Sequence, residues 1–453
     1  MICLIEMAER QEVALVIHAA LGYIDNRLVP DVSLAINNGI IVDINKKEDI
    51  LGRYKPEAIL NGENKLLLPG LVDAHTHVSQ QFLRGRLQEQ PIMVWKKFLI
   101  PYESTLSEDD VYISTKCACL EMIKSGITGF ADAGGPFPEV VCEVVEEMGL
   151  RAAITISAMD FGDIPRNMKF SAEELIARLE KLFTNWHGKG NGRINVFGGI
   201  RQLMTSTPEL IDVINDFVRV HQTGLHLHVA EDRAEIDFCL TKYGRRPVEW
   251  LNERGVLDNY VLAAHCIFIS DNEAKILATK NVNVVHCPAS NLSGQGFPKI
   301  SQLLALDTNV SIATDGAGWS KLDLFELARL LSLSIQANYG LPIHSTTLLL
   351  QGFELLNMIT KAPAKACQFN SGVLEVGKNA DVILVDINKP HLIPNIDNIT
   401  SLIVNLNAQD VSDVIINGKV VMKNGEVLCE DEERIKKLGN IQGKKILKRA
   451  GIA

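Results

Sequence analysis

Eight short apolar runs recur between residues 66 and 317, and each is followed by a stretch of helical character. The runs are LLLPGLVDAHTH (66–77), ITGFADAG (127–134), RAAITISAM (151–159), INVFGGIRQ (194–202), GLHLHVAED (224–232), YVLAAHCIF (260–268), VNVVHCPASN (282–291) and VSIATDGA (310–317). They lack strict alternation of polar and apolar residues, as expected for strands that are buried on both faces. Eight strand-then-helix units predict an α/β fold built on a (β/α)₈, TIM-like barrel, although a doubly wound open sheet shows the same alternation.

The two ends of the chain have a different pattern, in which short strands and turns replace the long helices. Three Asn-Gly pairs in these ends are typical of tight hairpin turns, because both residues of such a turn have positive φ. The pairs are Asn38-Gly39, Asn417-Gly418 and Asn424-Gly425. We therefore predict that residues 1–65 and 369–453 build a small β-sandwich domain, with a charged helical tail, beside a barrel of residues 66–368.

Composition and charge restrict the classes of partner. The 453 residues are 47% hydrophobic and 22% charged, which is typical of a folded globular chain. A formal net charge of −10 argues against nucleic acid or an anionic membrane as a partner. Residues 1–16 lack the basic start, apolar core and small-residue cleavage site of a signal peptide, and no apolar run is long enough to span a membrane. We therefore expect a cytoplasmic protein.

The predicted strand ends carry histidines and a carboxylate, and functional groups of such barrels gather at the C-terminal ends of the strands. His75 and His77 end the first strand on the same side, since alternate strand residues face one way. Any one histidine alone would be read as a buried structural residue, but His228 and Asp315 recur at later strand ends. Together they suit one divalent ion, Zn²⁺ first and Fe²⁺ or Mn²⁺ as alternatives. The fourth strand, 194–202, has no lysine that could be carboxylated to bridge a second ion.

Glu231 and His265 are the candidate proton carriers. A bound Zn²⁺ lowers the pKa of its water to about 7, which supplies hydroxide at neutral pH. Asp315 is both a ligand and a candidate acceptor of the water proton. Glu231, three residues after His228, would carry a proton to a substrate ring nitrogen beside the attacked carbon, and then to the leaving group. His265 would orient the attacking hydroxide. His226 faces the same way as His228 but lacks a carboxylate at that offset, so we expect it to pack or to support a ligand.

These motifs resemble the amidohydrolase superfamily. The segments that carry the resemblance are PGLVDAHTH (69–77), HVAE (228–231), YVLAAH (260–265), HCPASN (286–291), ATDG (313–316) and GVLEVGKNADVILVD (372–386). Within the superfamily they are similar to the branch of amino-heterocycle deaminases and triazine hydrolases, which includes guanine deaminase and methylthioadenosine/S-adenosylhomocysteine deaminase. The resemblance covers nearly the whole chain. It implies one metal ion on the ligands named above, hydrolytic chemistry at a heterocycle, and a homo-oligomer, with a homodimer expected.

The positions expected to select the substrate do not all resemble the same member of this branch. Methylthioadenosine/S-adenosylhomocysteine deaminases hold the ribose with a Glu directly before a Trp, where this chain has Val94 before Trp95. They also have a His after the fourth strand, where this chain has Arg201. Gln80 and Arg201 resemble the residues that hold the oxo-purine in guanine deaminase, and such groups suit a ring with a carbonyl and adjacent N–H groups. A surface loop residue and a structural ion pair are the equally weighted alternatives for these two.

Four residues are therefore candidates for substrate binding: Gln80, Arg201, His286 and Trp95. For His286, bracing of the barrel mouth is the alternative. We predict a metal-dependent aminohydrolase that replaces the amino group of a small N-heterocycle (an oxo-purine, a pterin or a related nucleoside) by oxygen and releases ammonia. The same site could displace chloride or an alkylamine from a triazine, or open a cyclic amide. A non-catalytic scaffold ranks last, because a scaffold is expected to lose ligands.

Overall fold

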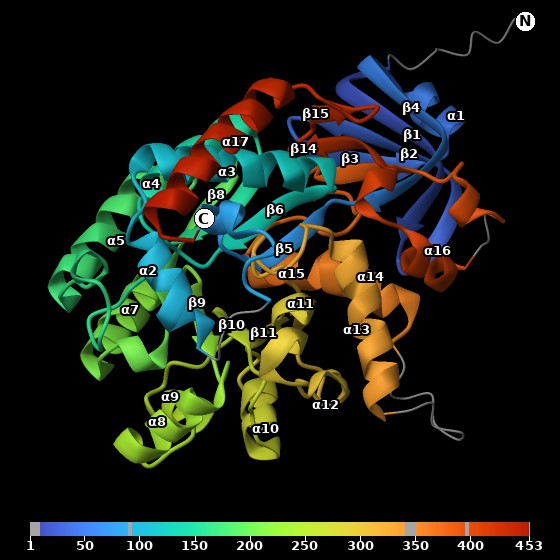
Figure 1. Cartoon of the computed structure of the whole chain (residues 1–453). Helices are drawn as coiled ribbons and strands as arrows, with labels where there is room; N and C mark the ends of the chain where they lie inside the picture. Colours follow the sequence, from blue (N-terminus) through green and yellow to red (C-terminus); the bar gives the residue numbers. More distant parts are fainter. Residues whose placement is uncertain (1–9, 89–92, 340–349, 395–397, 453) are drawn as a thin grey trace, which may run out of the picture.

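The computed structural model describes residues 10–88, 93–339, 350–394 and 398–452. Eight parallel strands follow one another around a sheet in the same order as in the sequence (Figure 1). They are β5 (Leu71–Thr76), β6 (Ile127–Asp132), β7 (Arg151–Thr155), β8 (Ile194–Ile200), β9 (Leu225–Val229), β10 (Val261–His265), β11 (Asn283–His286) and β12 (Val310–Ile312). A doubly wound sheet would reverse its strand order at a switch point. The nearly closed barrel therefore confirms the predicted fold class.

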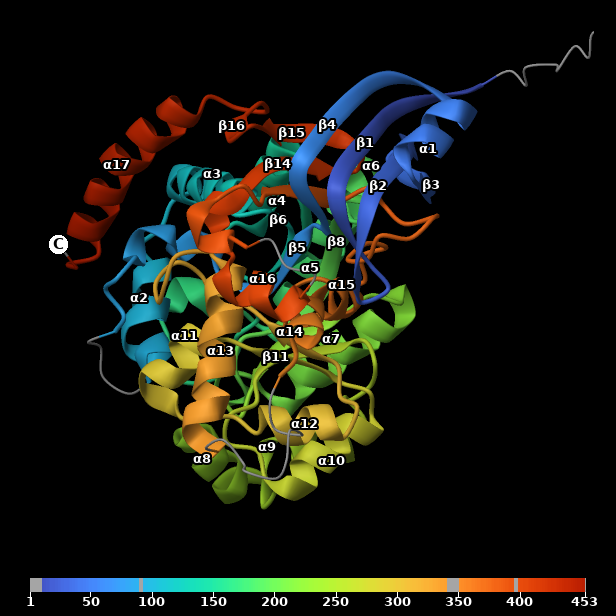
Figure 2. The same ribbon diagram turned by 90° about the vertical axis from the view of Figure 1, so that its right-hand side faces the viewer.

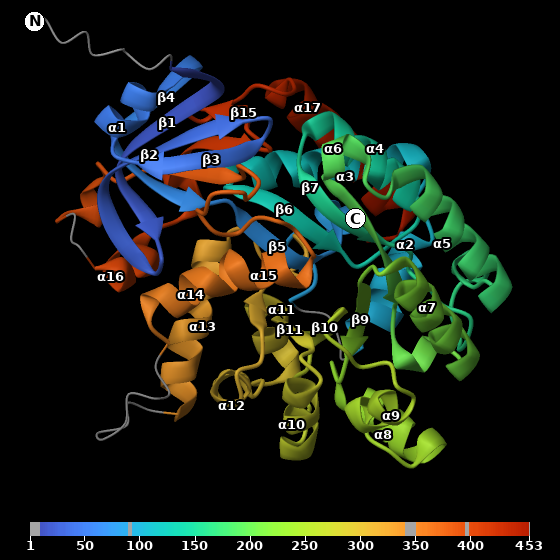
Figure 3. The ribbon, with the colours of Figure 1, turned by 180° about the vertical axis from the view of Figure 1, so that it is seen from behind.

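Helices cover the outside of the barrel strands (Figure 3). They are α3 (Glu108–Lys124), α4 (Pro138–Met148), α5 (Ala172–Trp186), α7 (Pro208–His221), α8 (Arg233–Tyr243), α9 (Pro247–Glu253), α10 (Asp271–Thr279), α12 (Ile300–Ala305) and α13 (Leu324–Tyr339). The side chains of Ser107, Ser171, Thr207 and Ser270 each accept a hydrogen bond from the backbone N–H three residues later. Such capping satisfies a free donor of the first turn, so these side chains set where the helices begin.

A second sheet, built from both ends of the chain, lies beside the barrel (Figure 2). Strand β4 (Tyr54–Pro69) joins the two ends, because it pairs parallel with β1 (Gln11–Ile24) and antiparallel with β13 (Val382–Asp386). The other strands are β2 (Arg27–Asn37), β3 (Ile40–Asn45), β14 (Val411–Ile416), β15 (Lys419–Lys423) and β16 (Glu426–Val427). The long strands curve around an apolar core to which six of the eight strands contribute. This arrangement confirms the separate β-domain.

The predicted turns and tail are also present. Both residues of each Asn-Gly pair have positive φ, and each pair connects two antiparallel strands. The tail forms α17 (Glu432–Arg449), which packs against α3. The remaining α-helices are α1 (Lys47–Arg53), α2 (Ile100–Glu103), α6 (Lys189–Gly192), α11 (Pro288–Ser290), α14 (Gly352–Ile359), α15 (Lys361–Ala366) and α16 (Ile399–Asn405). Among the described residues, no helix combines the length and apolar character that crossing a membrane requires.

A buried ion pair connects the barrel to the second sheet. Nε and Nη2 of Arg151, the first residue of β7, donate to the two carboxylate oxygens of Asp381 at 2.8 and 3.2 Å. Asp381 directly precedes β13 and also accepts the backbone N–H groups of Asn417 and Gly70. The two charged side chains are only 3% and 2% exposed. The exact domain limits at residues 65 and 368 remain a prediction, since β4 itself continues to Pro69.

Removing one partner of this ion pair should destabilise the protein strongly. Asp381→Ala leaves Arg151 buried without a carboxylate, and we expect the free energy of unfolding to fall by about 3–5 kcal/mol. The double variant Arg151→Met/Asp381→Leu should recover most of that loss, because both charges are then absent. Asp386→Ala, which removes a half-exposed partner of Lys389, is the control and should cost less than about 1 kcal/mol. Urea unfolding measures all three, and equal effects of the two single variants would contradict this role.

Candidate metal centre and active site

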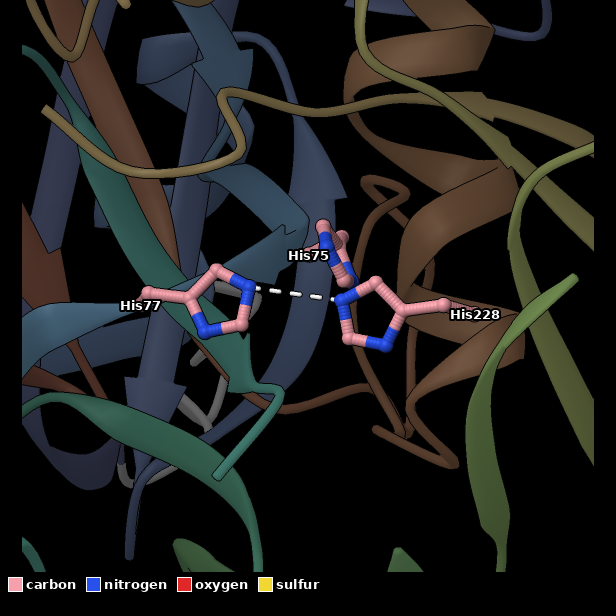
Figure 4. Close-up of side chains that lie close together, drawn as sticks. All are labelled: His75, His77 and His228. Atoms are coloured by element: carbon pink, nitrogen blue, oxygen red, sulfur yellow. Dashed lines mark hydrogen bonds between the residues drawn. The ribbon is translucent and has the colours of Figure 1, made fainter. Parts of the chain in front are cut away.

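A buried group of histidines lies at the barrel mouth. His75 is the penultimate residue of strand β5. His77 follows that strand, directly before the 3₁₀ helix η1 (Val78–Leu83). Figure 4 shows Nε2 of His77 facing Nε2 of His228 on β9 at 3.4 Å, with His75 beside them. The centroids of the three rings lie 4.8 to 5.5 Å apart. Residues separated by about 150 positions therefore place ring nitrogens at one point, as the sequence predicted.

Asp315, just after β12, contacts the same histidines. Its Oδ1 lies 3.2 Å from Nε2 of His75 and 3.6 Å from Nε2 of His77. Its backbone N–H donates to the carbonyl oxygen of His75, which ties the eighth strand end to the first. Burial alone would raise the pKa of Asp315, but the adjacent imidazole of His75 and the nearby His265 and His77 hold that pKa below its usual range. Asp315 is therefore an anion at neutral pH.

The donor atoms of these four side chains fit a divalent metal ion. One ligand atom from each of His75, His77 and His228 lies within 4.8 Å of the others, and the same holds for His75, His265 and Asp315. Burial lowers the pKa of all three candidate ligand histidines, so their rings are neutral and have a lone pair to donate. Nε2 of His75 is buried without a hydrogen-bond partner among the described residues. Imidazole and carboxylate are ligands that zinc takes in proteins.

His226 lies two residues before His228 on β9 and has a different partner. Its Nε2 is 2.7 Å from Nδ1 of His75, on the side of that ring away from Asp315. Histidines that bind metals commonly use their second ring nitrogen in such a contact, which fixes the tautomer and the ring orientation. His226 is therefore placed to orient His75, which agrees with the supporting position expected from the sequence.

Glu231 lies just beyond β9 and is held from several sides. Nε2 of Gln295 donates to its Oε1 at 2.8 Å, and Nε2 of Gln202 donates to its Oε2. The backbone N–H of Glu231 donates to Oε2 of Glu235 at 3.1 Å. Nε2 of His265 is 4.0 Å from Oε1 of Glu231. Burial raises the pKa of Glu231, while the neighbouring His265 lowers it, so this carboxyl group is placed to gain and lose a proton beside the metal centre.

His265, the last residue of β10, is connected to His286 through an amide. Nδ1 of His265 lies 2.9 Å from Oδ1 of Asn291, and Nδ2 of Asn291 lies 2.8 Å from Nδ1 of His286. Because an amide oxygen only accepts hydrogen bonds, His265 carries a proton on Nδ1, and its Nε2 lies on the side of Glu231. Burial lowers the pKa of His286 to about 3, so its ring is neutral and can accept from the amide. Substrate binding by His286 stays a prediction.

Three strand ends have backbone conformations that are unusual for residues with a side chain. The φ angles of Ala230, His265 and Asp315 are 50°, 72° and 57°. A left-handed conformation costs roughly 1–2 kcal/mol for such a residue, and it persists where the surrounding structure enforces it, often at functional sites. These three turns follow β9, β10 and β12 and direct the chain so that Glu231, His265 and Asp315 meet at the barrel mouth.

Gln80 and Arg201 meet at a carboxylate that the sequence analysis did not predict. Glu103, the last residue of α2, is fully buried, and both of its oxygens lie 3.2 Å from Nη1 of Arg201. Nε2 of Gln80 donates to Oε1 of Glu103 at 2.6 Å. Gln80 is 1% exposed, so it is not the surface residue that was one alternative. Arg201 does form a buried ion pair, and contact of either residue with substrate stays a prediction.

Trp95 lies on the wall of a cavity of about 440 Å³. Its Nε1 donates to Oδ2 of Asp232 at 3.2 Å. Val94, Trp319 and Gln295 line the same cavity, and Gln295 also holds Glu231. Gln295 therefore connects the cavity wall to the candidate proton carrier, and the cavity volume is in the range of small-molecule sites.

Several side chains of this site were missed in the sequence. Gln202 and Asn291 lie within segments that the sequence analysis had singled out, directly after Arg201 and at the end of HCPASN. A search for amides next to the candidate acid–base groups would have found them. Glu103 and Gln295 come from a helix and a loop away from the strand ends, and no local pattern indicates them.

The chain belongs to the amidohydrolase family, whose profile matches residues 66–421. It is 35% identical over 392 residues to a 5-methylthioadenosine/S-adenosylhomocysteine deaminase of Caldanaerobacter subterraneus subsp. tengcongensis, covering 85% of this chain and 88% of the relative. It is also 35% identical over 405 residues to a 5'-deoxyadenosine deaminase of Methanocaldococcus jannaschii, covering 87% and 93%. The solved structure of an adenosine deaminase from Xanthomonas campestris with bound zinc matches with a TM-score of 0.90 at 26% identity, covering 97% of this chain and 100% of that one. These findings confirm the resemblance inferred from the motifs.

Loss of one candidate ligand should remove the metal ion. We expect His77→Ala and Asp315→Asn to lower the bound metal from about one ion per chain to near zero after dialysis, because the first change deletes one donor atom and the second removes the negative charge of a ligand. His226→Ala should keep the ion with an affinity about 10–100-fold weaker. His221→Ala, at a partly exposed histidine of α7, is the control. Plasma mass spectrometry with circular dichroism measures these outcomes, and full metal content in both ligand variants would disprove the assignment.

Proposed function

We propose that the protein is a mononuclear metal-dependent aminohydrolase that cleaves the bond between an N-heterocycle and its exocyclic amino group. Water supplies the oxygen that stays on the ring, and the amino nitrogen leaves as ammonia. One observation carries the proposal: three imidazoles and Asp315 converge on one buried point, with the carboxyl group of Glu231 beside it. A scaffold has no need of this convergence, which favours an enzyme.

The ion would be held by His75, His77, His228 and Asp315. When bound, a divalent ion such as Zn²⁺ lowers the pKa of water to about 7 and so provides a nucleophile at neutral pH. The bound zinc of the structurally similar adenosine deaminase supports zinc as that ion. Fe²⁺ and Mn²⁺ are the alternatives, and activity after reconstitution with each ion separates them. The absence of lysine from β8 supports a single ion.

The side chains around this centre move the protons. Asp315, anionic beside two imidazoles, is placed to take the proton of the attacking water. Nε2 of His265, 4.0 Å from Oε1 of Glu231, is placed to orient the same water. Glu231 transfers a proton to the ring nitrogen next to the attacked carbon and then to the departing amino group. Of the two protons of the attacking water, one stays on the ring nitrogen and the other converts the departing –NH₂ group to ammonia, so the reaction needs no other reactant.

Two observations bear on the substrate. The relatives that are 35% identical are named as deaminases of 5-methylthioadenosine, S-adenosylhomocysteine and 5'-deoxyadenosine, which supports a purine nucleoside with a modified 5' position. The Trp95 cavity, whose lining residue Gln295 contacts Glu231, offers room for such a group. Gln80 and Arg201 instead favour an oxo-purine or pterin, whose carbonyl they could bind while Glu103 holds them. Val94, without a carboxylate for ribose, also favours the second substrate class.

Ammonia release from a panel of substrates tests the proposal. The zinc-loaded chain would be assayed with 5'-deoxyadenosine, methylthioadenosine, S-adenosylhomocysteine, guanine, pterins, cytosine and aminotriazines. Release from any amino-heterocycle supports the proposed reaction and identifies the class. Release of chloride or an alkylamine from a triazine, without deamination of any purine or pterin, would favour the alternative leaving group. A metal-loaded chain that is inactive on all of them would disprove the proposal. A cytoplasmic location and a homo-oligomer stay predictions.

Glu231→Gln should abolish turnover without removing the ion. The substitution keeps the size of the side chain but removes the proton that it exchanges, and we expect kcat to fall by about 10²–10⁴-fold. Metal content should stay at the wild-type level, since Glu231 is not among the candidate ligands. Glu253→Gln, at an exposed glutamate paired with Arg245, is the matched control and should be fully active. Full activity of Glu231→Gln would show that another group carries the proton.

A further inference from the structure

Two glutamines contact the carboxyl group of Glu231, and the proposed reaction alone does not explain why either of them is there. Gln202 lies two residues beyond the end of β8, and Gln295 ends the short helical turn η5 (Asn291–Gln295). Each directs its amide nitrogen to a different oxygen of the same carboxyl group. Gln202 is 1% exposed, so its amide is committed to this interior position.

The direction of the two hydrogen bonds fixes the orientation of both amides. Each glutamine turns its NH₂ group toward an oxygen of Glu231 and its carbonyl oxygen away, because the amide nitrogen is the donor in both hydrogen bonds. Oε1 of Gln202 and Oε1 of Gln295 are both buried, and neither has a hydrogen-bond partner among the described residues. Buried acceptors are normally paired, so two unpaired ones beside one catalytic group indicate that a ligand pairs them.

The two unpaired oxygens lie close to the group that transfers the protons. Each belongs to an amide whose nitrogen is bound to Glu231, and in the proposed reaction Glu231 protonates the ring nitrogen and the departing group. Gln295 also lines the Trp95 cavity, so its side chain lies between that cavity and Glu231. An exocyclic –NH₂ group has two N–H donors, one for each carbonyl oxygen.

We infer that Gln202 and Gln295 are specificity-determining residues, whose carbonyl oxygens bind the N–H groups at the reacting carbon and so select an amino leaving group. This inference rests on the proposed function and narrows it. Chloride, an alkoxy group and a dialkylamino group have no N–H donor, and each would direct lone pairs or methyl groups at two unpaired oxygens. A site built to pair with a substrate N–H rejects an analogue that lacks it, because its own polar groups then stay unpaired.

The alternative is that the two amides only hold Glu231 in place. Loss of a group that only positions Glu231 would slow every substrate by a similar factor, since Glu231 serves all leaving groups. Loss of an acceptor for N–H would slow the amino substrate and spare the analogues. The ratio of kcat/KM between an amino substrate and its analogues therefore separates the two roles, whereas activity on one substrate does not.

The experiment uses the full metal-loaded chain with the best amino substrate of the panel and analogues of the same ring. For adenosine these are 6-chloropurine riboside, 6-methoxypurine riboside and N6,N6-dimethyladenosine. The variants are Gln202→Met and Gln295→Met, which keep the length of the side chain and remove the amide. Gln336→Met on α13, outside the site, is the matched control. Metal content and thermal unfolding show that each variant is folded and loaded, and Gln295→Met remains informative if Gln202→Met does not fold.

We expect either site variant to lower kcat/KM for the amino substrate by about 10–100-fold. The value for the chloro analogue should change by less than about threefold, so the preference for the amino group falls. Equal losses on all substrates, or no loss, would overturn the inference while leaving the proposed function intact. Wild-type protein that releases ammonia from no amino-heterocycle would instead overturn the proposed function, and this inference with it.

Discussion

The structure depends on four electron-pair donors that converge at one buried point. Nε2 of His75 and Nε2 of His77 lie against the carboxylate of Asp315, and Nε2 of His228 faces that of His77, so lone pairs and a negative charge lie together away from water. Such an arrangement is unfavourable unless a cation neutralises it. The barrel strands hold these side chains in place. The backbone N–H of Asp315 donates to the carbonyl oxygen of His75, and His226 contacts Nδ1 of the same His75 ring. A bound divalent ion would therefore stabilise the folded state as well as provide chemistry.

Much of the fold could be predicted, because its signals are local. The eight apolar runs each form a barrel strand, and the Asn-Gly pairs and serine caps lie where the turns and helices begin. The candidate metal centre could also be predicted from the sequence. In a parallel barrel the C-terminal strand ends meet at one mouth, so residues such as His75 and Asp315 are brought together by topology alone. The candidate ligands, Glu231 and His265 do meet there.

The contacts around that centre could not be predicted in the same way. Glu103 contacts Gln80 and Arg201 from a helix whose position depends on packing of the segment after β5. Gln295 contacts Glu231 from η5, the short helical turn that follows α11. Neither position is fixed by strand periodicity. Gln80 and Arg201, which the sequence analysis had weighed as substrate-binding residues, are thus both held by one buried carboxylate. The substrate class depends on such contacts, which is why the sequence left it open.

X-ray absorption spectroscopy of the zinc-loaded protein tests the central claim most directly. A single ion held by His75, His77, His228 and Asp315 predicts a first shell of nitrogen and oxygen at about 2.0–2.2 Å, with the outer-shell scattering of three imidazole rings. The same spectrum should show no metal–metal scattering at about 3.5–4 Å, where a two-metal centre would give it. A metal–metal distance in that range, or a first shell containing sulfur or lacking imidazole, would contradict the mononuclear centre on which this account rests.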